Sequence, residues 1–118
     1  MNDQLPKFEA LTGEQLSSVI FVADYVQFDF NGPILTAISN PIARLRSGAL
    51  RFPDKGSRDA LCSLIHQYVA AAVVEESKRI EVAFDSGDSL VIPLDSASYE
   101  GPEAATFGDP RKGGLLVW

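Results

Sequence analysis

The chain has 118 residues, of which 46% are hydrophobic and 22% charged, and its formal net charge at pH 7 is −6. The apolar content excludes a disordered chain, and the length predicts one domain, residues 1–118. The acidic balance argues against general affinity for nucleic-acid phosphates. No apolar run approaches the roughly 20 residues that cross a bilayer, and the N-terminus lacks signal-peptide character. We therefore expect a cytoplasmic protein that binds neither nucleic acid nor membrane.

Residues 1–12 are mixed and polar, so we expect a loosely attached N-terminal segment that packs on the domain through Phe8 and Leu11. Residues 19–22 are all apolar and predict a short buried strand.

Residues 25–38 predict a β-hairpin. Val26, Phe28 and Phe30 alternate with polar residues, which places them on one face of a strand. Asn31-Gly32 follows them, and this pair favours a tight hairpin turn that needs φ > 0 at both positions. The residues that continue the alternation on the return strand are Ile34, Thr36 and Ile38.

Residues 41–60 form a basic island in an acidic chain, with five bases and two acids. Within it, residues 42–46 and 49–52 predict a small hairpin around Ser47-Gly48. Arg44 and Arg46 are candidate binding residues on this hairpin, and two interpretations stay open. The island is a solvated edge strand whose charge discourages strand pairing, or it is a docking patch for an acidic partner.

Residues 57–67 predict the one helix. Ser57 suits the N-cap position, and Asp59 suits the positive end of the helix dipole. Apolar residues then recur at helical spacing, and residues 69–74 predict a strand after the helix. The residues of the apolar stripe are Leu61, Leu64, Ile65 and Tyr68.

Residues 80–94 form the strongest hairpin prediction. On each side of the turn sequence Asp85-Ser86-Gly87-Asp88, every second residue is a large apolar one. A single hairpin is marginally stable in water, so its apolar face has to be covered by the rest of the chain. That face consists of Ile80, Val82, Phe84, Leu90, Ile92 and Leu94.

The two hairpins resemble each other at an offset of 54 residues. This offset matches Val26 with Ile80, Phe28 with Val82 and Phe30 with Phe84. With two more residues around the second turn, the return strands match Ile34 with Leu90, Thr36 with Ile92 and Ile38 with Leu94. The likeness indicates either an internal duplication or the similarity of any two amphipathic hairpins.

Groups that carry chemistry are scarce. One cysteine and one histidine exclude an intramolecular disulfide and a conventional zinc site. We expect Cys62 to be a small packed thiol and His66 a surface residue of the helix. No nucleotide-binding, hydrolase or metalloprotease motif is present, so we expect no catalytic residues, no metal and no cofactor.

The segment Tyr99-Glu100-Gly101-Pro102-Glu103-Ala104-Ala105 and the terminal Leu115-Leu116-Val117-Trp118 are the least generic part of the chain. One interpretation is a turn anchored by Tyr99, followed by a terminal strand that docks Trp118. The other is a polar-rimmed aromatic patch for a partner. That patch would be lined by Tyr99, Glu100, Glu103 and Trp118.

The order of these elements from Leu61 to Trp118 resembles a group of small bacterial proteins of unknown function. The likeness is carried by the Tyr99–Ala105 segment and the terminal Val117-Trp118. It implies no catalytic residues. Some similar small acidic proteins act as immunity partners of bacterial toxins, which suggests a role by analogy.

Together the patterns predict an α+β fold in which six to eight mostly antiparallel strands form a sheet or roll packed against one helix at about 57–67. The function we expect is a non-catalytic protein-interaction module that binds a protein partner or forms a homodimer. Toxin immunity is one form of it. The alternatives are a small-molecule-binding roll or barrel with an apolar cavity, and an enzyme that uses Cys62, His66 or a cluster of carboxylates.

Overall fold

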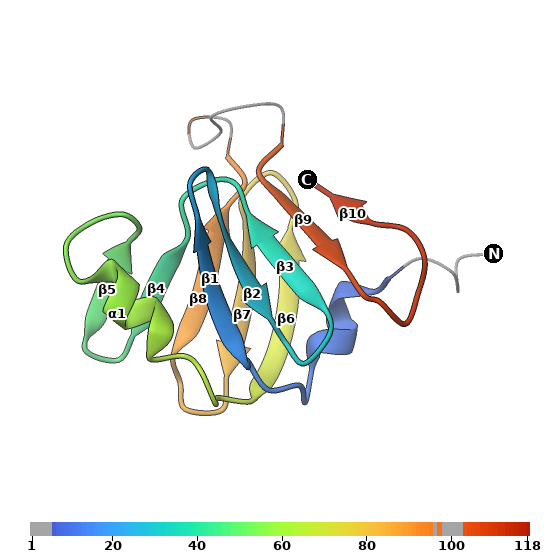
Figure 1. The fold of residues 1–118 in the computed structure, drawn as a ribbon. Coiled ribbons are helices and arrows are strands. Elements are labelled where there is room, and N and C mark those ends of the chain that lie inside the picture. The colour runs from blue at the N-terminus through green and yellow to red at the C-terminus, as the bar shows by residue number, and fades with distance from the viewer. Residues whose placement is uncertain (1–5, 96, 98–102) are drawn as a thin grey trace.

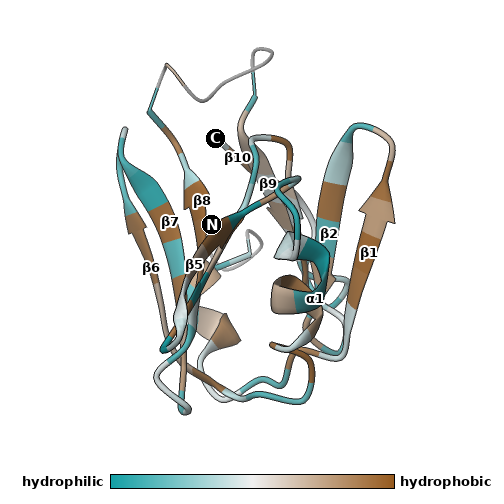
Figure 2. Ribbon diagram, turned by 90° about the vertical axis from the view of Figure 1, so that its left-hand side faces the viewer, coloured by the Kyte–Doolittle hydropathy of each residue, from teal (hydrophilic) through white to brown (hydrophobic). Residues whose placement is uncertain are grey.

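The computed structural model describes residues 6–95, 97 and 103–118, in which two antiparallel five-stranded sheets face each other (Figure 1). The predicted α+β class is confirmed. Ten strands lie in the described residues, rather than six to eight, and they form two layers, seen from the side in Figure 2.

The first sheet has the order β1-β2-β3-β9-β10 and contains β1 (Ser18–Val22), β2 (Tyr25–Asp29), β3 (Ile34–Ala37), β9 (Ala105–Gly108) and β10 (Leu116–Val117). The second sheet has the order β5-β4-β8-β7-β6 and contains β4 (Ile42–Leu45), β5 (Gly48–Arg51), β6 (Val69–Glu75), β7 (Arg79–Phe84) and β8 (Ser89–Pro93). The 3₁₀ helix η2 (Phe8–Leu11) lies against β6, and the helix α1 (Ser57–Cys62) lies beside β4, β5 and β1.

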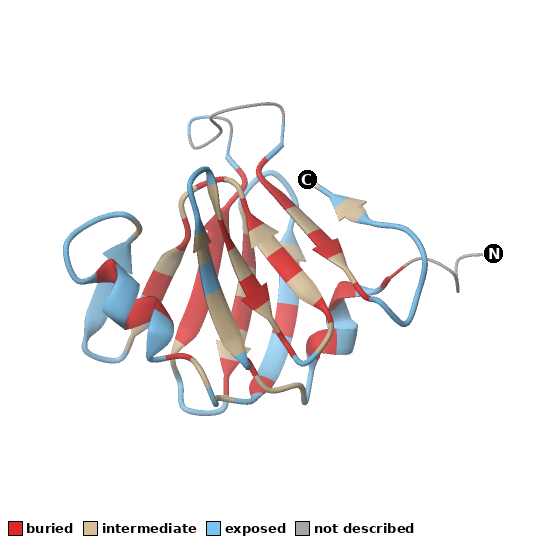
Figure 3. Ribbon diagram, viewed as in Figure 1, coloured by how far each residue is buried: buried red, intermediate tan, exposed pale blue. Residues whose placement is uncertain are grey.

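The core lies between the two sheets, where inward side chains of both layers meet. Buried and half-buried residues alternate along β2, β3 and β7 (Figure 3), and on β2 and β7 the buried residues are those of the predicted apolar faces. The strand β8 is buried along its whole length. The largest fully buried side chains include Phe28, Phe30, Phe107, Leu35, Leu64 and Leu90.

The strand order repeats within the chain. The strands β1, β2 and β3 of the first sheet correspond to β6, β7 and β8 of the second sheet, and β9 and β10 correspond to β4 and β5. Read in opposite directions, the two sheets then have the same order. Each half therefore supplies three consecutive strands to one sheet and a hairpin to the other. A short helix also precedes each half and packs on strands of the other half, η2 on β6 and α1 on β4. This topology favours internal duplication over a generic likeness.

The predicted match between the two return strands is wrong by one residue. Phe28 lies opposite Leu35 and Val82 lies opposite Leu90, so Leu35 corresponds to Leu90. A turn centred on Asn31-Gly32 dictates this pairing, and opposite residues share one face of a sheet. Leu35 and Ala37 are accordingly buried. The residues in the opposite phase are Ile34, Thr36 and Ile38.

The helix is shorter than the predicted residues 57–67. It ends at Cys62, because the chain from His66 onward pairs with the backbone around Leu16: His66 N donates to Leu16 O, and Leu16 N donates to Gln67 O. Gly56 occupies the N-cap position predicted for Ser57. Cys62 is exposed, so the prediction of a packed thiol is wrong.

Candidate functional site

The predicted residues Arg44 and Arg46 lie on the second sheet but in different surroundings. Arg44 points outward from β4 and pairs with Glu81 on β7 at 3.4 Å. Arg46 lies in the turn after β4, where its backbone N donates to Asp88 and its guanidinium donates to the Ser86 carbonyl. These contacts join β4 to β7 and to the β7–β8 turn.

Trp118 is the C-terminal residue and follows the edge strand β10 of the first sheet; the end of the chain is marked C in Figure 1. Its ring packs edge-to-face on Phe8 at 5.9 Å, and its carbonyl accepts a hydrogen bond from Ala104 N. The predicted terminal strand is confirmed, since β10 pairs with β9. Glu103 is exposed next to Ala104, so it lies near Trp118, whereas Arg44 belongs to the other sheet. The remaining predicted residues, Tyr99 and Glu100, lie outside the described residues.

The outer face of the first sheet carries a continuous row of uncharged side chains. Strand pairing aligns one residue from each of the five strands across the sheet. The two ends of the row, Ile20 and Val117, are 40% and 48% exposed, and Gln27 donates a hydrogen bond to Thr36 at 3.3 Å. The strand β1 is hydrophobic along nearly its whole length (Figure 2). The uncharged face is defined as Ile20, Gln27, Thr36, Thr106 and Val117.

The equivalent row on the second sheet mixes charged and apolar side chains, with Arg51 and Glu81 as its charged members. It runs across β5, β4, β8, β7 and β6. Ion pairs flank it, including Arg44 with Glu81 and Arg79 with Glu75, each at 3.4 Å. The two outer faces thus differ in charge although their strand order repeats. The row consists of Arg51, Ile42, Val91, Glu81 and Val73.

A groove of about 440 Å³ lies on the uncharged side, between the outer surface of β3 and β9 and the loop that joins β9 to β10. Its lining includes Ile34, Thr36, Thr106 and Leu115. Leu115 lies over Gly108, where a Cβ would come within 3.1 Å of its Cδ1. Gly108 therefore allows the loop to approach the sheet closely, which brings an apolar side chain to the edge of the uncharged face.

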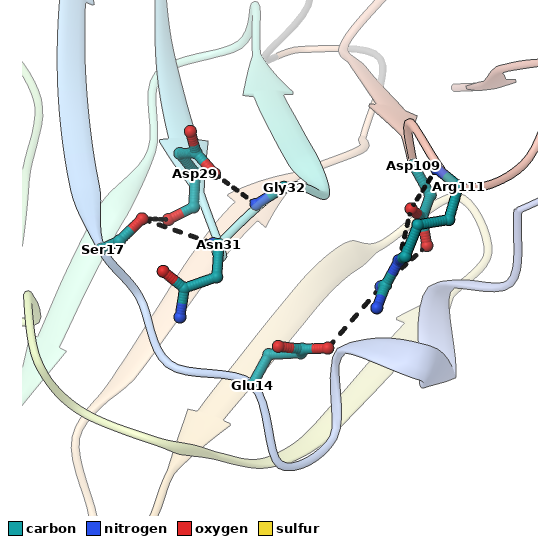
Figure 4. A network of polar contacts seen from close by, with 7 residues as sticks. All are labelled: Glu14, Ser17, Asp29, Asn31, Gly32, Asp109 and Arg111. Carbon is teal, nitrogen blue, oxygen red and sulfur yellow. Dashed lines mark hydrogen bonds and ion pairs between the residues drawn. The ribbon is translucent and has the colours of Figure 1, made fainter.

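The β9–β10 loop is held by a charged network (Figure 4). The carboxylate of Asp109 accepts hydrogen bonds from Arg111 N, Nε and Nη2 at 2.9, 2.9 and 3.0 Å, and Arg111 also pairs with Glu14 at 3.6 Å. The Arg111 hydrogen bonds outweigh the desolvation of Asp109 and hold the pKa of its carboxyl below the ordinary value. These contacts attach the β9–β10 loop, which forms one side of the groove, to Glu14 in the segment before β1.

The neighbouring β2–β3 turn has its own polar contacts (Figure 4). Ser17 Oγ donates to the Asp29 carbonyl at 2.8 Å, and the Asp29 carboxylate accepts from Gly32 N at 2.9 Å. Asn31 and Gly32 have φ of 61° and 128°, as their turn type demands. Asp29, the acidic residue of β2, is thus engaged at the end of the strand, and its carboxylate is directed to the turn.

Side chains suited to catalysis or to metal binding are scattered over the surface of the described residues. Cys62 and His66 are both exposed, and they do not share a helix, since His66 has φ of 80° beyond the end of α1. Within residues 6–95, 97 and 103–118, no three or more His, Cys, Asp or Glu side chains gather in a metal-binding arrangement. This part of the chain contains no helix long and apolar enough to cross a membrane.

No family model, curated protein or solved structure matches the chain. Sequence reasoning missed the uncharged face because it depends on the pairing of β3 with β9, which are some 70 residues apart along the chain. The available signal was the lack of charge at alternate positions, seen at Gln27, Thr36 and Thr106.

Proposed function

We propose that this chain is a non-catalytic protein-interaction module that binds a second copy of itself through the uncharged face. The single observation that carries the proposal is the charge difference between the two outer faces. Each copy has a net charge of −6, so association is least opposed where no like charges meet. A two-fold contact sets the same patch on both partners, and a row without charges is compatible with itself.

The composition of the face suits a reversible contact. Exposed Ile20 and Val117 supply apolar area at the ends of the row, and the side chains of Gln27, Thr36 and Thr106 supply uncharged polar groups between them. Non-obligate interfaces mix apolar and polar area in this way, whereas charged residues are depleted at their centres.

The size of the face sets the expected affinity. A row with one outward residue from each of five strands spaced ~4.8 Å apart, each taking up about two residue lengths of ~3.4 Å, covers roughly 160 Å² per copy. A stable interface buries about 800 Å² per partner, so the face supports a weak, transient dimer even with the groove added. We expect dissociation at roughly 0.1–1 mM.

Sedimentation velocity over a range of protein concentrations tests the proposal. Ile20→Glu puts a carboxylate on the uncharged face and is expected to weaken self-association at least tenfold. Val73→Glu is the matched control, because Val73 lies opposite Glu81 on β6 as Ile20 lies opposite Gln27 on β1, and both are exposed. It is expected to associate like the wild type.

A wild-type protein that stays monomeric at millimolar concentration would refute a second copy as the partner. Equal weakening by Ile20→Glu and Val73→Glu would refute the choice of face. In the first case the immunity interpretation, in which a toxin is the partner, would become the better hypothesis for the module; in the second case the second copy would remain the partner and only the contact surface would change.

A further inference from the structure

A second cleft, of about 540 Å³, lies where the β1–β2 turn, the connection from β3 to β4 and the start of α1 meet. Its lining includes one cation, Arg58, and one acid, Asp24, together with Tyr25, Asn40 and Phe52. The cleft opens to the surface at one side of the sandwich, and its floor includes the core residues Val26 and Ala37. It is therefore accessible to a small ligand.

Aromatic rings fix the position of the cation. The guanidinium carbon of Arg58 lies 4.9 Å from the ring centroid of Phe52 and 5.8 Å from that of Phe21. The two rings stack on each other with centroids 5.7 Å apart and planes at 20°. The guanidinium of Arg58 makes no hydrogen bond or ion pair with any described residue. The rings hold the guanidinium in place by cation–π contact, and its N–H donors stay free.

The duplicated topology provides an internal comparison. A cleft of about 520 Å³ lies against η2, where Trp118 follows β10 as Phe52 follows β5. Here the open side of the sandwich is closed by aromatic contacts of Phe8 with Phe107 and with Trp118, at 5.3 and 5.9 Å. The charged residues that line this second cleft are Glu9 and Glu76.

Closing a side of this sandwich therefore does not require a cation. The aromatic cluster around Phe8 does so beside two acids, whereas the cluster around Phe52 carries an arginine whose donors are unused. The difference between equivalent positions indicates that Arg58 serves a ligand as well as the packing of the rings.

We propose that the Arg58 cleft binds a small organic carboxylate, with the guanidinium fork donating to both carboxylate oxygens. The proposal is independent of self-association. One cation beside one acid suits a singly charged anion better than a phosphate dianion, because Asp24 would repel the dianion about twice as strongly. The apolar part of the ligand would lie against Phe52, and Tyr25 and Asn40 supply uncharged hydrogen-bonding groups at the rim.

Titration with sodium benzoate, followed by amide chemical shifts in ¹⁵N spectra, tests the proposal on the full chain. We expect saturable shifts confined to residues 23–26, 38–41 and 52–58. Arg58→Gln is expected to lower benzoate affinity at least tenfold. Arg58→Lys keeps the positive charge but loses the paired N–H donors of the guanidinium, so the benzoate affinity of this variant should also fall several-fold. Arg51→Gln is the control, because Arg51 is an exposed arginine of β5 outside the cleft.

Three results would overturn the proposal. These are unchanged affinity in Arg58→Gln, shifts centred on Glu9 and Trp118 instead, and inorganic phosphate binding as tightly as benzoate. The amide spectrum of Arg58→Gln without ligand reports whether this variant folds. If it does not, Arg58→Lys decides, and wild-type affinity in that variant would equally contradict recognition by the fork.

Discussion

Replacing Leu35 by alanine, with Thr36→Ala as its neighbour control, tests the sheet register on which the uncharged face depends. Leu35 is fully buried and lies opposite Phe28 on β2 and Phe107 on β9. Thr36 is half-buried in the opposite phase and accepts a hydrogen bond from Gln27. Adjacent residues on one strand thus face the core and the outer surface.

The two substitutions have different expected costs. Burying a leucine side chain contributes about 1.5–3 kcal/mol, and the cavity left between two aromatic rings that cannot collapse brings the cost of Leu35→Ala to about 3–5 kcal/mol. Thr36→Ala loses one hydrogen bond at a half-exposed position, which costs about 0.5–1 kcal/mol. A domain of this size is stable by about 5–15 kcal/mol, so the first variant should be visibly weakened.

Urea denaturation at pH 7, followed by circular dichroism, measures both free energies of unfolding. We expect Leu35→Ala to shift the midpoint strongly and Thr36→Ala to stay close to the wild type. A similar cost for both variants, or a larger cost for Thr36→Ala, would refute the register and remove Thr36 from the outer face.

Two further predictions concern polar groups. Ser57→Ala should raise the free energy of unfolding by about 1 kcal/mol in thermal or urea melts, because the Ser57 hydroxyl is buried without a partner among the described residues; a destabilised variant would contradict this. Asp109→Asn should lower stability by about 1 kcal/mol at pH 7, a value discounted because Arg111 is 58% exposed. Since the pKa of Asp109 is lowered in the folded state, its contribution is present above the ordinary value near 3.8 and lost as the pH falls through the folded pKa. Urea melts from pH 7 to pH 3 should show the two proteins converging below about pH 4, and a constant difference would count against the assignment.

The elements with a single consistent pattern were predictable from the sequence. Residues 80–84 have one alternating phase and are followed by a turn rich in Asp, Ser and Gly, and residues 80–94 form the β7–β8 hairpin as predicted. The return strand at Ile34-Leu35 has apolar residues in both phases, so alternation alone did not choose between them. Its register follows from the turn, which pairs Phe28 with Leu35.

The remaining differences have long-range causes. Apolar spacing predicted a helix to residue 67, but backbone pairing with the segment around Leu16 ends the helix at Cys62. Because this long-range pairing ends the helix early, the thiol of Cys62 is exposed instead of packed. The β9–β10 hairpin of the second half joins the sheet of the first half, which places Thr106 beside Thr36. No local sequence pattern predicts the pairing of these two strands. The uncharged face and the Arg58 cleft both depend on such contacts.

Amide chemical shifts compared between dilute and concentrated samples of the wild-type protein test the central proposal most directly, because they map the contact without any substitution. We predict concentration-dependent shifts along the uncharged face, at Ile20, Gln27, Thr36 and Thr106, with none along β4 and β7. Shifts that cluster around Arg44 and Glu81 on the second sheet, or a spectrum that does not change with concentration, would contradict it.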